Sequence, residues 1–225
     1  MPPFIPVSRR TFLHTSAALA AAAAAWPRRL MAAGEGLPEG KDLVVRSAMP
    51  FNAEPALAEL VAEAITPVSL FYVRNHGPTP KLAEEGYKLR VEGLVHNPRE
   101  WSLADIRCTA AQAEQEATLT CAGNRRLEMS AIKPVAGVQW DAGAIGHARW
   151  MGARLASVLE AAELKPDAKH VWFEGLDPIK EKDGSVAPFG GSIPLARALA
   201  MDNPVLLAHE MNGQPLTAEH GAPLR

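Results

Sequence analysis

Short segments with the pattern of β-strands outnumber helical ones along this chain, and they do not alternate regularly with long helices. Alternating apolar and charged residues predict a half-buried strand at 87–91, and strand-like runs at 116–121 and 170–177 end at turn or loop residues. The dipeptide Asn212-Gly213 predicts a hairpin between two apolar runs. This arrangement favours an α+β fold with mixed, strand-rich sheets over a doubly wound parallel sheet.

The predicted helices are few and short. Apolar residues at helical spacing predict helices at 52–67, 155–162 and 192–201, and Lys165-Pro166 marks the end of the second. A further short helix opens at Ser102, with Asp105 at the capping-box position. Segments 43–51 and 137–152 are predicted to be irregular, with Trp140 and Trp150 as buried anchors; Trp172 is also expected in the core.

Composition narrows the function classes. With 48% hydrophobic residues the chain can bury a substantial core. A net charge of -2 and a pI near 6.4 give no support for nucleic-acid binding. No G-x-G-x-x-G sequence opens a helix, so a Rossmann-type nucleotide site is not expected.

The N-terminal segment has the pattern of an export signal. Arg9 and Arg10 precede an alanine-rich stretch, 17–25, that is too short to span a bilayer, which takes about 20 apolar residues. Residues 1–34 are therefore predicted to be a twin-arginine signal, a type used for folded, cofactor-loaded cargo, with no membrane attachment after its removal. An ordinary amphipathic helix or a Sec signal is the alternative. The predicted location is the bacterial periplasm.

The sequence LTCAGNRR, residues 119–126, places a cysteine at the predicted end of a strand. Cys121 could form a disulfide with Cys108, act as a nucleophile, bind a metal or be inert; Cys108 is otherwise expected to be a buried or half-buried free thiol. The neighbouring Arg125 and Arg126 favour a thiolate. No histidine has the context of a nucleophile's base, and the spacing does not suit zinc, but a soft transition metal remains open.

LTCAGNRR resembles the cysteine motif of the sulfite oxidase family of molybdenum enzymes. Further stretches resemble the same family in the same order over 70–225: FYVRNHGPTP, GVQWDAGAIGHARWMGARL, VWFEGLD, GGSIPLARA, LLAHEMNGQPL and EHGAPLR. The resemblance implies a molybdenum-molybdopterin cofactor with Cys121 as the protein's metal ligand. Arg74, which also follows a predicted strand, would meet the anionic substrate, so that Arg74 and Cys121 are the implied catalytic residues. The implied cofactor-contacting residues are Tyr72, Val73, Arg74, Asn75, His76, Asp177, His220 and Arg225.

The activity implied by the resemblance is oxidation of sulfite to sulfate by oxygen-atom transfer, with electrons passed to a c-type cytochrome, as in a bacterial periplasmic sulfite dehydrogenase. Two alternatives stay open. One is a related molybdopterin oxidoreductase acting on nitrate or a sulfoxide, and the other is a non-enzymatic secreted β-rich protein with a Cys108–Cys121 disulfide.

The resemblance also implies domain boundaries. Residues 35–225 are expected to be a molybdopterin-binding catalytic domain that is incomplete at its C-terminus, because family members continue into a β-sandwich dimerisation domain. The chain is therefore expected to be an N-terminal fragment, inactive alone, of a protein that forms a homodimer or heterodimer.

Overall fold

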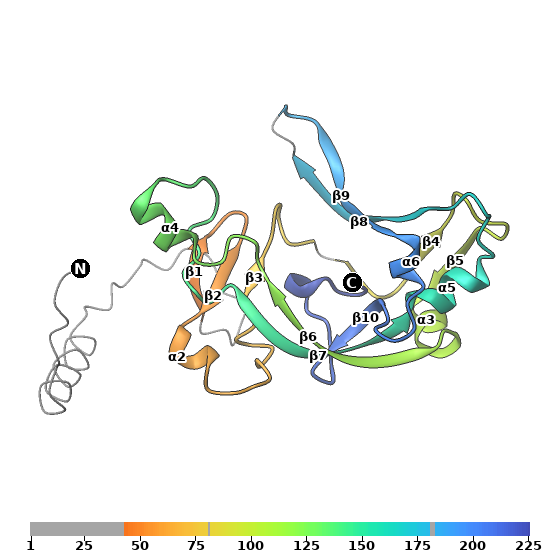
Figure 1. The fold of residues 1–225 in the computed structure, drawn as a ribbon, viewed down its shortest axis with the longest axis horizontal. Helices are drawn as coiled ribbons and strands as arrows, with labels where there is room; N and C mark the ends of the chain where they lie inside the picture. Colours follow the sequence, from red (N-terminus) through yellow and green to blue (C-terminus); the bar gives the residue numbers. More distant parts are fainter. Residues whose placement is uncertain (1–42, 81, 181–182) are drawn as a thin grey trace, which may run out of the picture. The chain divides into compact units, whose positions relative to one another are not determined.

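The computed structural model describes residues 43–80, 82–180 and 183–225. All described residues belong to one compact unit, the second of the two into which the chain divides. The predicted export signal at 1–34 lies outside the described residues. Figure 1 shows the helices and strands of the second unit. In the described part of the chain, no helix has the length and apolarity needed to cross a membrane.

The largest sheet has four antiparallel strands in the order β11-β10-β7-β6 (Figure 1). Its strands are β6 (Gln112–Thr120), β7 (Ile145–Arg154), β10 (Leu206–Met211) and β11 (Gln214–Pro215). β6 and β7 pair without interruption from Gln112↔Ala153 to Thr120↔Ile145. Exposed and half-buried residues alternate along β6, as expected when one face of a sheet is covered.

Three smaller sheets, all antiparallel, complete the strand pairing of the described residues. They are β1-β2-β3 (Leu43–Ser47, Asn52–Pro55, Val73–Arg74), β4-β5 (Lys88–Val91, Arg99–Ser102) and β8-β9 (His170–Lys180, Val186–Pro194). The helices are α2 (Leu57–Leu60), α3 (Leu103–Thr109), α4 (Arg126–Ile132), α5 (Leu155–Ala161), α6 (Leu195–Ala198) and the 3-10 turn η1 (Ala218–His220). The prediction of a strand-rich α+β fold is confirmed.

Two short sequence signals, the capping box at Ser102 and the dipeptide Asn212-Gly213, form the local structures that they predicted. Ser102 caps α3 through a capping box, in which its hydroxyl accepts from the Asp105 backbone N–H (3.1 Å) and the Asp105 carboxylate accepts from the Ser102 N–H (2.9 Å). Asn212 and Gly213 both have positive φ, 54° and 73°, and form the turn between β10 and β11. A two-residue turn with both φ values positive is the one that Asn-Gly favours.

The predicted helix at 52–67 is mostly wrong. Its first residues form β2, which pairs with β1 and β3, and only a four-residue α2 follows. Leu57 and Val61, which gave the helical spacing, are 55% and 72% exposed. The helical periodicity has no apolar surface to pack against, and strand pairing takes the residues before it.

The two segments predicted to be irregular contain regular strands. Residues 43–47 form β1, and 145–154 form the ten-residue β7. Glycines suggested a loop at β7, but Gly152 allows close packing there, since a Cβ would meet the Leu207 backbone in the neighbouring strand. The predicted helix at 192–201 shrinks to the four residues of α6, because Ser192 to Pro194 extend β9.

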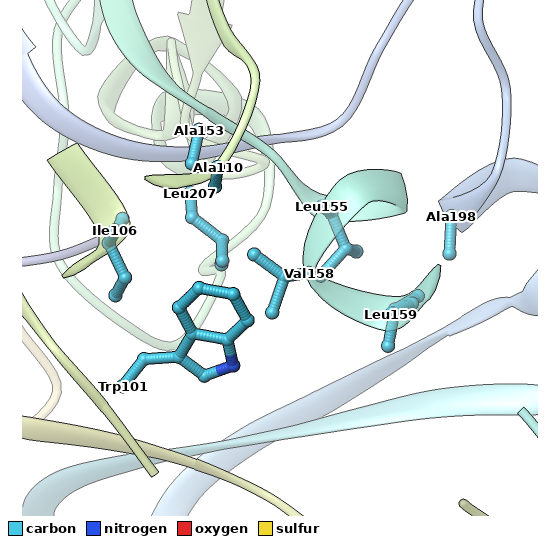
Figure 2. Packing of buried hydrophobic residues seen from close by; sticks show 9 residues of the cluster. All are labelled: Trp101, Ile106, Ala110, Ala153, Leu155, Val158, Leu159, Ala198 and Leu207. Carbon is cyan, nitrogen blue, oxygen red and sulfur yellow. The ribbon is translucent and has the colours of Figure 1, made fainter. Parts of the chain in front are cut away.

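The buried core lies around α3, α5 and the adjoining strands. Figure 2 shows its members: Trp101, Ile106, Ala110, Ala153, Leu155, Val158, Leu159, Ala198 and Leu207. A second cluster covers one face of the large sheet and comprises Phe71, Ala148, Trp150, Ala208, Met211 and Leu216. Trp140 and Trp150 are buried as predicted, whereas Trp172 in β8 is 62% exposed, contrary to expectation. Its indole N–H donates to the Glu174 carboxylate at 3.0 Å on the outside of the β8-β9 hairpin.

Candidate functional site

Cys121 follows the last residue of β6 and is half-buried. Its backbone N–H donates to the Ala144 carbonyl (2.9 Å), and its own carbonyl accepts from the Asn124 N–H (2.9 Å). The Gly123 N–H lies 3.4 Å from the Cys121 sulfur and donates toward it. The turn thus aims one backbone donor at the sulfur.

Both cysteines are free, so the structure does not support the alternative of a Cys108–Cys121 disulfide. Cys108 is exposed, which corrects the expectation of a buried or half-buried thiol. It lies in the last turn of α3, a seven-residue helix, and points outward because the apolar side of that helix is taken by Leu103 and Ile106.

Two arginines follow the cysteine and differ in surroundings. Arg125 is exposed and pairs with the Glu128 carboxylate at 2.5 Å. The half-buried Arg126 donates to the Val138 carbonyl (2.8 Å), and its guanidinium lies against Gly123 and Gly137, where a Cβ would meet it. Sequence reasoning did not assign Arg126 to the site; the glycines at 123 and 137 were the signal that a large side chain packs against them.

Tyr72 interacts electrostatically both with the turn at residues 121–124, here called the cysteine turn, and with Arg225. Its ring packs edge-to-face against Trp140 (6.3 Å between centroids) and stacks on Phe71 (5.4 Å). Burial raises the pKa of the Tyr72 phenol; the positive charge of Arg225 opposes this, and the Cys121 thiolate adds to it. Tyr72 therefore carries its proton at neutral pH, and these interactions bring Tyr72, Cys121 and Arg225 into one electrostatic environment.

His220 is 2% exposed and anchors the end of the chain to Tyr72. Its Nε2 lies 3.4 Å from the Tyr72 carbonyl, which can only accept, so Nε2 carries the proton and Nδ1 accepts from the Thr217 hydroxyl at 2.9 Å. The guanidinium of Arg225 lies over the Trp150 ring, 5.3 Å from its centroid, and donates to the His220 carbonyl at 3.4 Å. We call Tyr72, Cys121, His220 and Arg225 the cysteine side of the site.

Arg74, Asn75 and His76 leave the end of β3, as predicted. Nη1 of Arg74 donates to the Asn52 amide oxygen (3.1 Å) and to the Asn75 carbonyl, and Nη2 lies 3.3 Å from Nδ1 of His76. Because a guanidinium only donates, Nδ1 of His76 is the acceptor and the imidazole is neutral. Partial burial lowers the pKa of His76 and Arg74 lowers it further, against the opposing effect of Asp177.

Asp177 and Val73 complete the set of predicted residues. Asp177 is half-buried in β8, where the pairing with β9 shifts between Glu174 and Pro178, and it lies close enough to His76 to act on its pKa. The Val73 side chain is fully buried in an apolar cluster, so only its main chain can contact a ligand. We call Arg74, Asn75, His76 and Asp177 the arginine side of the site.

A hollow of about 270 Å³ lies on the covered face of the large sheet. Its lining is mainly apolar and is made by Gln115, Ala117, Leu119, Trp150, Arg197, Pro204, Leu206, Ala208 and Arg225. The three β6 residues in this lining are at alternate positions, and Cys121 continues their spacing. Among the described residues, no three His, Cys, Asp or Glu side chains converge as a ready set of metal ligands.

The comparisons with known proteins agree with this geometry. The model of the family described as oxidoreductase molybdopterin binding domain matches residues 76–225. The chain belongs to this family. The resemblance to the sulfite oxidase family of molybdenum enzymes is thereby confirmed, and the family's cofactor is molybdenum-molybdopterin. A second match, to the twin-arginine translocation signal, covers residues 6–26 and identifies this family member as exported to the periplasm by that route.

Similar members of the family include sulfite oxidases from Arabidopsis thaliana, 45% identical over 196 residues, and Gallus gallus, 48% identical over 192 residues. The matches cover 84% of this chain in both cases, but 49% and 41% of the two relatives. The chain thus spans about half the length of the curated relatives it matches. The sulfane dehydrogenase SoxCD of Paracoccus pantotrophus shares the fold, with a TM-score of 0.63, 24% identity, and coverage of 89% of this chain and 51% of that one.

The side chains present fit the family's cofactor. Cys121 is half-buried and its sulfur accepts from a backbone amide, which suits a soft thiolate ligand. The Arg225 guanidinium donates to the His220 carbonyl and lies over the Trp150 ring, and these contacts among the described residues place no carboxylate against it, so its charge is available to an anionic group.

Proposed function

We propose that the protein oxidises sulfite to sulfate in the periplasm and passes the two electrons to a c-type cytochrome. The observation that carries this proposal is the half-buried Cys121 thiol, which interacts electrostatically with Tyr72, as does Arg225. Arg74 follows Tyr72 by two residues in the chain. The similarity to proteins named sulfite oxidase supports sulfite as the substrate. We also propose that residues 35–225 belong to the molybdopterin-binding catalytic domain and that the whole protein is a homodimer or heterodimer.

The proposed cofactor contacts follow from the two sides of the site. Cys121 would hold the molybdenum. The remaining contacts would come from the other residues of the cysteine side, from the residues of the arginine side and from the main chain of Val73. When bound, the cofactor supplies oxygen-atom transfer and accepts two electrons. Arg225, which no carboxylate neutralises among its described contacts, suits the anionic tail of the cofactor.

Arg74 would bind and orient sulfite. Sulfite gains one oxygen atom that derives from water, and sulfate, two protons and two electrons are released. A guanidinium presents a planar fork of donors that matches two oxygens of an oxyanion. Burial and, after it, the contact with Arg74 lower the pKa of His76, so it adds no second charge, and it limits the directions in which the guanidinium can turn.

The test uses the full-length protein from the periplasm. We expect close to one molybdenum atom per chain and reduction of added cytochrome c that depends on sulfite. Turnover of nitrate or a sulfoxide with an artificial donor, and none of sulfite, would replace the proposed substrate by the alternative. Absence of molybdenum from a folded protein would contradict the proposal altogether. Sedimentation velocity on the same sample tests the dimer.

A further inference from the structure

The strand β2 (Asn52–Pro55) is unusual because all four of its residues are buried although two are polar. Asn52 is 0% and Glu54 1% exposed. Burial of an amide or a carboxylate is unfavourable unless it gains partners. Ala53, between them, packs with Leu43 and Val73, so Asn52 and Glu54 project together from the opposite face of the strand.

Asn52 contacts the arginine side. Its Oδ1 accepts from the Asn75 backbone N–H (2.9 Å) and from Nη1 of Arg74 (3.1 Å), and its Nδ2 donates to the Pro50 carbonyl (2.9 Å). The amide group thus cannot turn without losing a bond, and it fixes both the main chain after β3 and one edge of the Arg74 guanidinium.

Glu54 contacts the segment that supports the cysteine side. Its Oε1 accepts from Nε of Arg46 (2.5 Å) and from the Asp141 backbone N–H (2.7 Å). Arg46 also reaches the Asp141 carboxylate, at 3.6 Å. Gly143 lies directly on β2, since a Cβ there would meet the Pro55 carbonyl at 2.5 Å and the Glu54 side chain at 3.1 Å.

The segment held by Glu54, residues 140–144, in turn holds the cysteine turn. The Asp141 carbonyl accepts from the Arg125 N–H (2.7 Å), and the Ala144 carbonyl accepts from the Cys121 N–H (2.9 Å). The Asn124 amide oxygen accepts from the Ala144 N–H at 3.1 Å. A continuous path of short contacts therefore runs from the buried Glu54 carboxylate to the backbone of Cys121.

We propose that Asn52 and Glu54 are positioning residues, through which β2 sets where the Arg74 guanidinium and the Cys121 thiol stand relative to one another. The inference rests on the proposed roles of Arg74 and Cys121. Two residues separated by one position on a single buried strand serve the two sides of the site, so a change in either should disturb one side and leave the other.

The test of Asn52 uses the full-length protein with Asn52→Ala. We expect the KM for sulfite to rise by about tenfold or more, because a charged donor loses its acceptor, with molybdenum content and kcat little changed. Sulfate binding, measured by calorimetry, should weaken by a similar factor. Glu100→Gln, which removes an exposed pair with Lys88, is the control and should change neither quantity. An Asn52→Ala protein with wild-type KM and wild-type sulfate affinity would overturn this half of the proposal.

The test of Glu54 uses Glu54→Gln and Arg46→Met in full-length protein made without cofactor. We expect iodoacetamide to modify Cys121 severalfold faster than in the wild type, with Cys108 in the same molecules unchanged as the internal reference. In protein made with cofactor, molybdenum content should fall while the KM of the loaded fraction stays the same. Unchanged Cys121 reactivity in both variants would overturn this half, and so would equal acceleration at both cysteines, which indicates general loosening of the fold.

The two failures are distinguishable. If the wild type neither oxidises sulfite nor binds sulfate, the proposed function fails and the Asn52 half fails with it, while Cys121 reactivity still decides the Glu54 half. If the wild type oxidises sulfite and neither variant shows its selective effect, the inference about β2 fails alone.

Discussion

The cysteine side and the arginine side of the site are built in different ways. Cys121 is held by its main chain, and Tyr72 of the same side packs with Trp140 and Phe71, whose rings are at most 1% exposed. Arg74 and His76 are held by side-chain hydrogen bonds at the end of a two-residue strand, and His76 is exposed and stacked on Phe189 (5.3 Å).

The difference matches the tasks proposed for the two sides. A ligand to a resident metal must keep one geometry, and backbone hydrogen bonds within packed aromatic residues give little freedom. A group that binds and releases a diffusing anion needs access to solvent and tolerates small movements. The two sides should therefore respond differently to substitution.

The largest expected effect is at the ligand. Cys121→Ser should reduce molybdenum content and sulfite oxidation by more than about 100-fold, because a hydroxyl cannot replace a thiolate and even the loss of an outer partner costs about 10- to 100-fold. Metal analysis and cytochrome c reduction measure the two quantities. Cys108→Ser is the matched control and should behave as wild type, since that thiol is exposed and belongs to neither side of the site. Near-normal activity of Cys121→Ser would remove Cys121 from the site.

Next comes the arginine side. Arg74→Gln should lower kcat/KM for sulfite by about 10- to 150-fold, the equivalent of about 1.5–3 kcal/mol for a charged hydrogen bond, mainly through KM. Steady-state kinetics and molybdenum content are the measurements, and the molybdenum content should stay unchanged. Arg125→Gln, which removes only an exposed pair with Glu128, should leave both unaltered. Equal KM values for the wild type and Arg74→Gln would break the comparison.

A smaller effect is expected from packing beneath the cysteine side. In Gly146→Ala the added Cβ would lie 2.5 Å from the ring of Phe71, which stacks on Tyr72 and contacts His220. We expect a loss of about 1–3 kcal/mol in the free energy of unfolding, measured by urea denaturation, because the ring must move. Gly191→Ala in β9 has open space around its Cβ and is the control. Equal stability of the two variants would show that Phe71 is not fixed.

The smallest effect concerns a residue outside both sides. His209 is 5% exposed; burial lowers its pKa, as does Arg107, and Glu210 and Glu84 oppose them. As the pH drops, His209 takes up a proton at a higher pH in the unfolded chain than in the folded one. The free energy of unfolding therefore falls between pH about 6.5 and the lower pKa of the folded state, by at most about 1.4 kcal/mol per pH unit. The melting temperature should change less between pH 7 and pH 5 for His209→Gln than for the wild type. If the melting temperature of His209→Gln depended on pH as that of the wild type does, His209 would not be the source of the pH dependence.

Local signals predicted much of the site. The placement of Cys121 directly after β6, of Arg74 to His76 at the end of β3, and of the turn at Asn212-Gly213 each depended on residues within a few positions of one another. The packing of Trp140 and Trp150 followed from their size and apolarity. Family resemblance supplied the cofactor, which no local pattern contains.

The supporting residues were not predictable, because their contacts are non-local. Glu54 meets the Asp141 backbone across 87 positions of sequence, and both it and Asn52 lay in a segment with helical spacing. Trp172 shows the opposite error, since its apolar ring suggested the core but the β8-β9 pair leaves it in solvent. In each case tertiary pairing of strands decided what local spacing could not.

Because β6 pairs with β7 without interruption, odd-numbered and even-numbered residues of β6 face opposite sides of the sheet. Leu119 and Cys121 belong to the odd-numbered row that faces the covered side of the sheet, while Thr118 and Glu116 belong to the even-numbered row, where they meet His147 and Arg149. Deleting one residue from β6 would exchange the rows and turn the thiol toward the solvent-facing ion pairs, although every residue type remained. A change in the length of this strand therefore keeps Cys121 on the covered side only if it comes in steps of two residues.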